Sequence, residues 1–249
     1  MPTRKGDWLL LAGATGLVGA AAARSAAAQG AGLVLLGRSA EALSALAGEL
    51  AGEFSGTPVH PVVADLTDQA SLDAAFAALP AAGVDRLDAV VNLATGYTGR
   101  PVPVGELPAE EFRRVVDTDL VGAFLLVRTA LPLLRRAPDP RVVLVSSLAG
   151  LRGRPGAAHL CAAKAGVNGL ALALAIELGE QGVAVNTVAP GPIARPGVPH
   201  PPTPVPLASP EQVAAAVLRL TEAADARRGE TVIVTGEPIP DPSTPEVKQ

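Results

Sequence analysis

Seven short apolar runs alternate with longer alanine- and leucine-rich segments along most of this chain. The runs are apolar at nearly every position, which is typical of strands covered on both faces. They lie at Trp8–Ala12, Gly32–Leu36, Val59–Ala64, Leu87–Leu93, Arg141–Ser146, Val183–Val188 and Thr231–Thr235. The segments between them have a helical pattern over residues 17–29, 40–51, 68–79, 108–135, 157–179 and 209–224. This alternation predicts an α/β domain with one parallel sheet of about seven strands and helices on both faces.

Composition narrows the possible functions and locations. A net charge of −4 offers no basic surface of the kind that binds nucleic acid. The one cysteine, Cys161, excludes an internal disulfide and favours a reducing, cytoplasmic compartment. Because no composition shift divides the chain, we expect one domain over residues 1–236, followed by a proline-rich tail at 237–249.

Two apolar segments resemble membrane signals. The first, Trp8–Ala23, is interrupted by glycines and contains the first predicted strand, so its removal as a signal peptide would destroy the sheet. The second, Leu160–Leu178, is long enough to span a bilayer, but Lys164, Asn168 and Glu177 interrupt it. We therefore expect a soluble protein without a membrane partner.

A glycine-rich turn follows the first predicted strand and opens the first predicted helix. Its sequence is Gly13-Ala14-Thr15-Gly16-Leu17-Val18-Gly19. Glycines let the backbone approach a pyrophosphate, and free N–H groups at the helix start attract the negative charge. The turn therefore predicts a doubly wound sheet of the Rossmann type that binds a dinucleotide. The expected contacts within it are Gly13, Thr15, Gly16, Leu17 and Gly19.

The end of the second predicted strand indicates which dinucleotide is bound. A carboxylate at this point would favour NAD, but the sequence here is Gly37-Arg38-Ser39. The Arg38 guanidinium suits a 2′-phosphate, with Ser39 beside it, so we predict NADP(H) over NAD(H). A solvated Arg38 is the alternative. Asp65, with Leu66 after it, either accepts a hydrogen bond from the adenine amino group or is an ordinary turn residue.

Further along the chain, five short segments continue the pattern in a fixed order. They are Asn92-Leu93-Ala94-Thr95, Asp119-Leu120-Val121-Gly122, Ser146-Ser147-Leu148-Ala149-Gly150, Ala162-Ala163-Lys164-Ala165-Gly166 and Asn186-Thr187-Val188-Ala189-Pro190-Gly191-Pro192-Ile193. Together with the glycine turn, they resemble the short-chain dehydrogenase/reductase family over about residues 7 to 193. The resemblance implies that Asn92 and Ala94 support the adenine side of a cofactor. It also implies that Pro190, Gly191 and Ile193 lie over the nicotinamide.

The family transfers hydride between a nicotinamide and a small carbonyl or alcohol compound. In it a serine holds the substrate oxygen, a tyrosine carries the proton, and a lysine four residues after the tyrosine lowers its pKa and binds the nicotinamide ribose. The resemblance assigns the serine to Ser147 and the lysine to Lys164. The family keeps thirteen residues from the serine to the tyrosine and four from the tyrosine to the lysine, and both counts, from Ser147 and from Lys164, lead to Leu160. Residues i and i+4 share a helix face, so Leu160 is predicted to stand where the tyrosine belongs.

Two other side chains are candidates for the missing acid. Tyr97 is the only tyrosine and follows the fourth predicted strand, at the edge where ligands bind in open α/β sheets. It is either a substitute acid or part of a pocket wall. His159 is adjacent to Leu160, but neighbouring helix residues point about 100° apart. It reaches the site only through a local distortion, and a boundary histidine is the alternative.

Two charged residues also depart from the family pattern. Asp119 replaces an asparagine that helps to order the proton relay, and a carboxylate near Lys164 would hold the ammonium in its charged form. A solvent-facing helix charge is the alternative for Asp119. Arg195 replaces a threonine that contacts the carboxamide. It either binds a phosphate or acidic ligand or is solvated.

Three functional hypotheses remain from the sequence. The first is an NADP(H)-dependent oxidoreductase with an altered or weakened proton relay, acting on a small carbonyl or alcohol. The second is a silent NADP-binding sensor or subunit, and the third is a scaffold that binds no nucleotide. No metal site is predicted. Helices 108–135 and 157–179 are apolar beyond one face, and relatives pair these helices, so a homodimer or homotetramer is expected.

Overall fold

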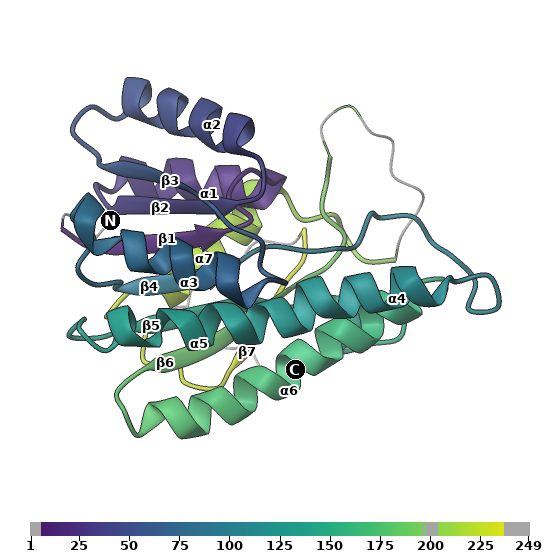
Figure 1. The fold of residues 1–249 in the computed structure, drawn as a ribbon. Coiled ribbons are helices and arrows are strands. Elements are labelled where there is room, and N and C mark those ends of the chain that lie inside the picture. Colours follow the sequence, from purple (N-terminus) through teal and green to yellow (C-terminus); the bar gives the residue numbers. More distant parts are fainter. Residues whose placement is uncertain (1–5, 196, 198–203, 237–249) are drawn as a thin grey trace, which may run out of the picture.

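The computed structural model describes residues 6–195, 197 and 204–236 of the 249-residue chain. Within them, seven parallel strands form one sheet in the order β3-β2-β1-β4-β5-β6-β7 (Figure 1). The strands are β1 (Trp8–Ala12), β2 (Gly32–Gly37), β3 (Val59–Val63), β4 (Ala89–Asn92), β5 (Arg141–Val145), β6 (Ala184–Pro190) and β7 (Thr231–Val234). The predicted parallel α/β fold is confirmed. The predicted tail, 237–249, lies outside the described residues.

Helices cover both faces of this sheet (Figure 1). They are α1 (Leu17–Ala28), α2 (Ala40–Glu53), α3 (Gln69–Ala78), α4 (Ala109–Val116), α5 (Gly122–Leu134), α6 (Ala158–Gly179) and α7 (Pro210–Leu220), with short helices at Pro80–Ala82 and Leu148–Gly150. Helices α1, α2 and α7 pack on one face, and α3, α5 and α6 on the other.

The central strands are apolar throughout because alternate side chains enter two different cores. In β1, Leu9 and Leu11 belong to the core under α1, α2 and α7. Leu10 and Ala12 belong to the core under α3, α5 and α6. Successive side chains of a strand point to opposite faces, and both faces are covered here. A continuous apolar run is therefore what a central strand of this sheet requires.

The segment expected to form one helix over 108–135 is divided in the structure. A five-residue π-helical segment at Asp117–Val121 separates α4 from α5. The wider π turn redirects the side chains around it, and such segments often occur at functional sites. Here it places Asp119 in the interior, where only 1% of the residue is exposed. Periodicity alone did not predict the break, because both halves are good helical patterns.

The order in which the chain adds strands to the sheet reverses between β1 and β4, which are neighbours in space but not in sequence. The chain winds outward from β1 through β2 to β3, then returns to β4 and continues the other way. The connections after β1 and β4 therefore separate at the carboxyl ends of the strands. Open α/β sheets bind ligands in the crevice at this kind of switch point.

Candidate dinucleotide and substrate site

The glycine turn lies at this crevice and depends on its glycines. Gly13 has a φ of +78°, and a Cβ there would come within 2.7 Å of the Ala94 nitrogen. A Cβ at Gly19 would overlap the carbonyl oxygen of Gly13. Gly16 is the N-cap of α1 and supplies no side-chain cap, so the first N–H groups of the helix stay available to an anion. The turn thus has the backbone that a bound pyrophosphate requires.

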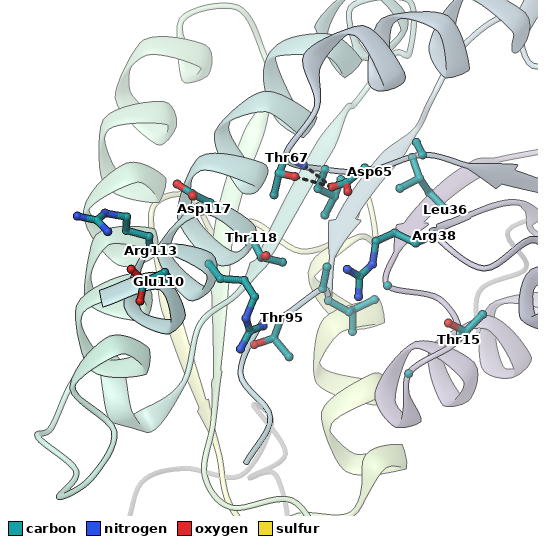
Figure 2. Close-up of a pocket in the computed structure, with 18 residues that line it drawn as sticks. Thr15, Leu36, Arg38, Asp65, Thr67, Thr95, Glu110, Arg113, Asp117 and Thr118 are labelled. Carbon is teal, nitrogen blue, oxygen red and sulfur yellow. Dashed lines mark hydrogen bonds between the residues drawn. The ribbon is translucent and has the colours of Figure 1, made fainter. Parts of the chain in front are cut away.

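A cavity of about 610 Å³ opens beside the turn (Figure 2). This volume lies within the usual range of small-molecule sites. The lining comes from the ends of β1 to β4 and from the α4 region: Gly13, Thr15, Gly16, Leu36, Gly37, Arg38, Ala64, Asp65, Leu66, Thr67, Leu93, Ala94, Thr95, Glu110, Arg113, Arg114, Asp117 and Thr118. Most of the predicted adenosine-side contacts therefore meet in one cavity. Its residues fit the adenosine and phosphate half of a dinucleotide.

Arg38 and Asp65 face the same cavity from neighbouring strands (Figure 2). The Asp65 carboxylate accepts hydrogen bonds from the Thr67 backbone N–H at 2.8 Å and from its hydroxyl at 2.7 Å. These two bonds hold the pKa of Asp65 below its usual value. Partial burial of the carboxyl raises the pKa and the positive charge of Arg38 lowers it, so the net shift is downward. Both proposed roles of Asp65 are compatible with this geometry, since only Oδ1 is engaged.

Several predicted cofactor residues support the cavity from outside its lining. The Ser39 hydroxyl caps α2 by accepting a hydrogen bond from the Ala42 N–H at 3.2 Å. The Asn92 side chain is buried and accepts from the Ala94 N–H at 3.1 Å, so it shapes the turn after β4. Leu17 is 47% exposed at the start of α1. None of the three lines the cavity.

A buried ion pair lies farther along the sheet edge. The Lys164 ammonium is 3.0 Å from Asp119 Oδ2 and donates a hydrogen bond to the Val145 carbonyl at 2.9 Å. Lys164 is only 4% exposed. The ammonium therefore has one hydrogen-bond acceptor and one ion-pair partner within the protein. Because Asp119 is 1% exposed, the solvent-facing alternative for it is excluded. Removing either partner would leave the other charge buried and unpaired, which destabilises the fold.

The loop after β4 completes the surroundings of Asp119. The Thr95 hydroxyl donates to Asp119 Oδ2 at 2.8 Å, and the Gly96 N–H donates to Asp119 Oδ1 at 2.5 Å. Neither residue was assigned a role from the sequence. Thr95 stood within a recognised segment, but the partner of its hydroxyl depends on where the π-helical segment places Asp119. The carboxylate thus joins the β4 loop to helix α6.

Ser147 follows β5 and begins the short helix at Leu148–Gly150. Its hydroxyl oxygen accepts from the Ala149 N–H at 3.1 Å, and the hydroxyl lies 3.5 Å from the Pro190 carbonyl oxygen, its acceptor. Pro190 ends β6, and the Gly191 N–H bonds to β7. Ile193 continues this segment and forms an isolated bridge with Ala208. The structure therefore brings Ser147 next to the predicted nicotinamide segment.

Leu160 is 6% exposed and packs with Ala149, Ala157, Tyr97 and Cys161. This small apolar cluster is separate from the two main cores. Leu160 lies one helical turn before Lys164 on α6. Its side chain has no atom that can carry a proton.

The two candidate substitute acids lie together beside this cluster. The rings of Tyr97 and His159 meet edge to face with centroids 5.2 Å apart. The Tyr97 hydroxyl and both His159 ring nitrogens are buried and lack a hydrogen-bond partner among the described residues. His159 is fully buried, and its Nε2 is 3.9 Å from Glu111 Oε1. Neither side chain has a hydrogen bond or ion pair with Ser147 or Lys164 within the described part of the chain.

The sequence profile of the family described as short chain dehydrogenase matches residues 7–199 of this chain. The chain belongs to the short-chain dehydrogenase family. It is thereby an oxidoreductase of the NAD(P)-dependent type, as the glycine turn and the cavity lead one to expect.

Curated members of the short-chain dehydrogenase family support the assignment. A 2-dehydro-3-deoxy-L-rhamnonate dehydrogenase (NAD(+)) of Sphingomonas sp. is 35% identical over 182 residues, which is 73% of this chain and 70% of that protein. Levodione reductase of Leifsonia aquatica is 35% identical over 190 residues, covering 76% of this chain and 70% of that protein.

Solved structures of the family extend the likeness beyond the matched sequence. A 3-oxoacyl-[acyl-carrier protein] reductase with bound NAD from Brucella melitensis superposes with a TM-score of 0.82 at 31% identity, covering 94% of this chain and 92% of that one. A levodione reductase structure gives a TM-score of 0.84 at 28% identity, over 93% and 97% of the two chains. The fold of this dehydrogenase thus continues to its last described strand.

Helix α6 is the one helix among the described residues that is long and apolar enough to cross a membrane. Its ion-paired Lys164 and its packing against β6 identify it as a helix of the dehydrogenase fold. Its outer face carries the exposed Leu172 and Ile176. Phe112 on α4 and Phe124 on α5 are also more than one-third exposed. These apolar side chains lie on the helices expected to pair in an oligomer.

Proposed function

We propose that this chain binds NADP(H) and transfers hydride between the nicotinamide and a small carbonyl or alcohol compound, with an impaired proton relay. The main observation behind the proposal is the Asp119–Lys164 ion pair. Lys164 lies one helical turn after Leu160 on α6, and the cavity that would hold the cofactor opens at the same edge of the sheet. The cofactor would supply the hydride when bound. This chain's residues would position it and hold the substrate oxygen at the Ser147 hydroxyl.

The preference for NADP(H) is supported by the charge at the end of β2. Arg38 lines the cavity, and the segment Gly37–Ser39 contains no carboxylate that would accept from a ribose hydroxyl. A guanidinium binds a phosphate through a planar pair of N–H groups. Two of the similar proteins are named for NAD or contain it, so this preference would distinguish the chain from them.

The impairment is supported by two features of the proton path. Leu160 takes the place that the family motif gives to tyrosine, and it has no ionisable group. The Lys164 ammonium is held by Asp119 and by the Val145 carbonyl, so it is drawn toward the protein interior. A positioned general acid accelerates a reaction about 10²–10⁴-fold, and hydride positioning is separate from it. We therefore expect slow turnover.

A silent NADP-binding sensor or subunit is the second candidate. Burial of the ion pair favours it, because a lysine and an aspartate that satisfy each other have a structural role without catalysis. Both candidates use the same cofactor cavity. They differ only in whether hydride reaches a substrate.

The test measures NADPH binding by fluorescence and then NADPH oxidation against a panel of small carbonyl compounds. Wild type, Leu160→Tyr and Tyr97→Phe are compared. Slow oxidation by wild type that rises about 10²-fold or more in Leu160→Tyr supports the impaired oxidoreductase. An inert wild type with an active Leu160→Tyr variant supports the silent protein. Loss of wild-type activity in Tyr97→Phe would show that Tyr97 is the acid and overturn the impaired relay.

We also propose that the protein is a cytoplasmic homodimer or homotetramer. The exposed apolar residues Phe112, Phe124, Leu172 and Ile176 on α4, α5 and α6 support a pairing of these helices. The single cysteine is consistent with a reducing compartment. Light scattering at micromolar concentration tests the oligomeric state, and a monomer would contradict it.

A further inference from the structure

We propose that the substrate is an anion: a small carbonyl or alcohol compound with a carboxylate or phosphate group that Arg154 and Arg195 bind. The proposal rests on the proposed function and adds the chemical class of the substrate to it. It concerns the outer part of the site, beyond Ser147 and Lys164, and is independent of the cofactor's 2′-phosphate.

Charge is distributed unevenly around the crevice. Three segments follow the carboxyl ends of β4, β5 and β6, at residues 93–105, 147–176 and 191–210. They contain no aspartate or glutamate, although the chain as a whole has a net charge of −4. Their cationic residues are Arg100, Arg152, Arg154, Lys164 and Arg195. Acidic residues belong to the adenosine side, where Asp65, Glu110 and Asp117 line the cavity, and Lys164 is paired with Asp119. The charge that remains on the three segments comes from their arginines, and it would attract an anion.

Two of these arginines meet the same short segment, Tyr97–Gly99, from different loops. The Arg154 guanidinium carbon lies 5.9 Å from the centre of the Tyr97 ring. Arg195 covers Gly99 so closely that a Cβ there would be 3.3 Å from its Nη2. Arg154 comes from the loop before α6 and Arg195 from the loop after β6. Folding therefore brings two arginines that are 41 positions apart in the sequence to one three-residue segment.

The segment between the arginines leads directly to the catalytic end of the site. Gly96 donates to Asp119, which is the partner of Lys164. Tyr97 packs against the cluster that contains Leu160. The substrate's carbonyl or alcohol carbon would lie near Ser147 and Lys164. An anionic group of the same substrate, held by the two arginines, would therefore lie farther from the sheet than this carbon. The carbonyl and the anionic group of the substrate are thus assigned to opposite ends of this segment.

Both guanidinium groups are available for such a ligand. Neither has a carboxylate partner within the described residues, whereas arginines elsewhere, such as Arg24 and Arg141, are ion-paired. The Arg154 guanidinium lies over the Tyr97 ring at a distance within the range of a cation–π contact. Planar N–H pairs match the geometry of carboxylate and phosphate oxygens.

The experiment measures binding of matched probe pairs to the NADPH-loaded protein by calorimetry. One pair is 4-oxopentanoate and 2-pentanone, and the other is dihydroxyacetone phosphate and dihydroxyacetone. The pairs distinguish a carboxylate ligand from a phosphate ligand. We expect at least one charged probe to bind about tenfold or more tightly than its neutral partner. Arg154→Ala and Arg195→Ala should each weaken that charged probe about tenfold and leave the neutral one unchanged.

Arg152→Ala is the matched control. It removes the same charge from the loop that carries Arg154, and no described contact joins Arg152 to Tyr97–Gly99. It should change the affinity for the charged probe less than about threefold, because it only weakens the positive electrostatic potential around the site. Equal affinity for charged and neutral probes, absence of binding at millimolar concentration, or equal effects of all three variants would overturn the proposal.

NADPH is present so that Arg38 does not bind the charged probes. Should NADPH fail to bind, the same comparison is made in the Arg38→Ala background. Failure of cofactor binding would then count against the proposed function alone. Absence of charge selectivity in that background would count against the anionic substrate.

Discussion

The two ends of the crevice use their charged side chains differently. At the adenosine end, Arg38 faces a cavity and has no ion-pair partner among the described residues. At the catalytic end, Asp119, Lys164, Thr95 and the Gly96 amide satisfy one another in the interior. A site keeps its affinity for a ligand while its polar groups remain open to that ligand. Under the proposed function, turnover is slow because the groups that would act on the substrate bind each other instead.

The largest effect on stability is expected at the catalytic end. Asp119→Ala would leave the Lys164 ammonium buried without its partner and remove an acceptor for Thr95 and Gly96. The free energy of unfolding should fall by about 3–5 kcal/mol. Urea denaturation measures it, with Asp117→Ala, an exposed neighbour, as the control. A loss no greater than in the control would show that the pair contributes nothing.

At the adenosine end, the corresponding change is in the backbone. Gly13→Ala places a Cβ on a residue with φ of +78° and against the backbone of Ala94. The combined strain should cost roughly 2–3 kcal/mol and displace the turn, so NADPH binding should be lost. Gly48→Ala, in α2 with open space around the new Cβ, is the matched control. Unchanged NADPH affinity in Gly13→Ala would show that the glycine turn does not bind the cofactor.

Arg38→Ala tests whether the open charge selects the cofactor. Loss of a guanidinium–phosphate contact should weaken NADPH binding by about 1.5–3 kcal/mol and leave NADH binding unchanged. Fluorescence titration with both nucleotides measures the difference, and Arg113→Ala, which alters another arginine of the cavity wall, is the control. Equal losses for NADPH and NADH would favour the solvated interpretation of Arg38.

The smallest effect is expected from Thr67→Val, which removes one hydrogen bond to Asp65. This bond lowers the pKa of Asp65, so it stabilises the fold above the unfolded pKa and is lost as pH falls through the folded pKa. Because Asp65 is partly exposed and keeps its bond from the Thr67 N–H, the variant should lose less than about 1 kcal/mol at neutral pH. The difference from wild type should disappear only in acid below the lowered pKa of folded Asp65, where the carboxyl is protonated in both the folded and the unfolded state. Thermal melts across pH values measure it, and a difference that persists there would exclude Asp65 as its source.

The sequence predicted those parts of the site whose role depends on neighbouring residues alone. The glycines of the first turn need no distant partner to reveal their role, since their spacing and the flanking strand determine the backbone path. Arg38 was found in the same way, at the end of a predicted strand. Ser39 was also predicted to contact the cofactor, and that contact stays a prediction; the structure adds that its hydroxyl caps α2, which a serine before a helix commonly does.

The sequence by itself determined the parallel α/β fold, the glycine turn and the position of Leu160 relative to Ser147 and Lys164. These features follow from periodicity and spacing, which are properties of neighbouring residues. Only the tertiary structure decided that Asp119 is buried, that Thr95 and Gly96 bind it, and that Arg154 and Arg195 reach the same segment, Tyr97–Gly99. Each of these contacts joins segments distant in the chain, and the π-helical turn that places Asp119 leaves no mark in a helical pattern.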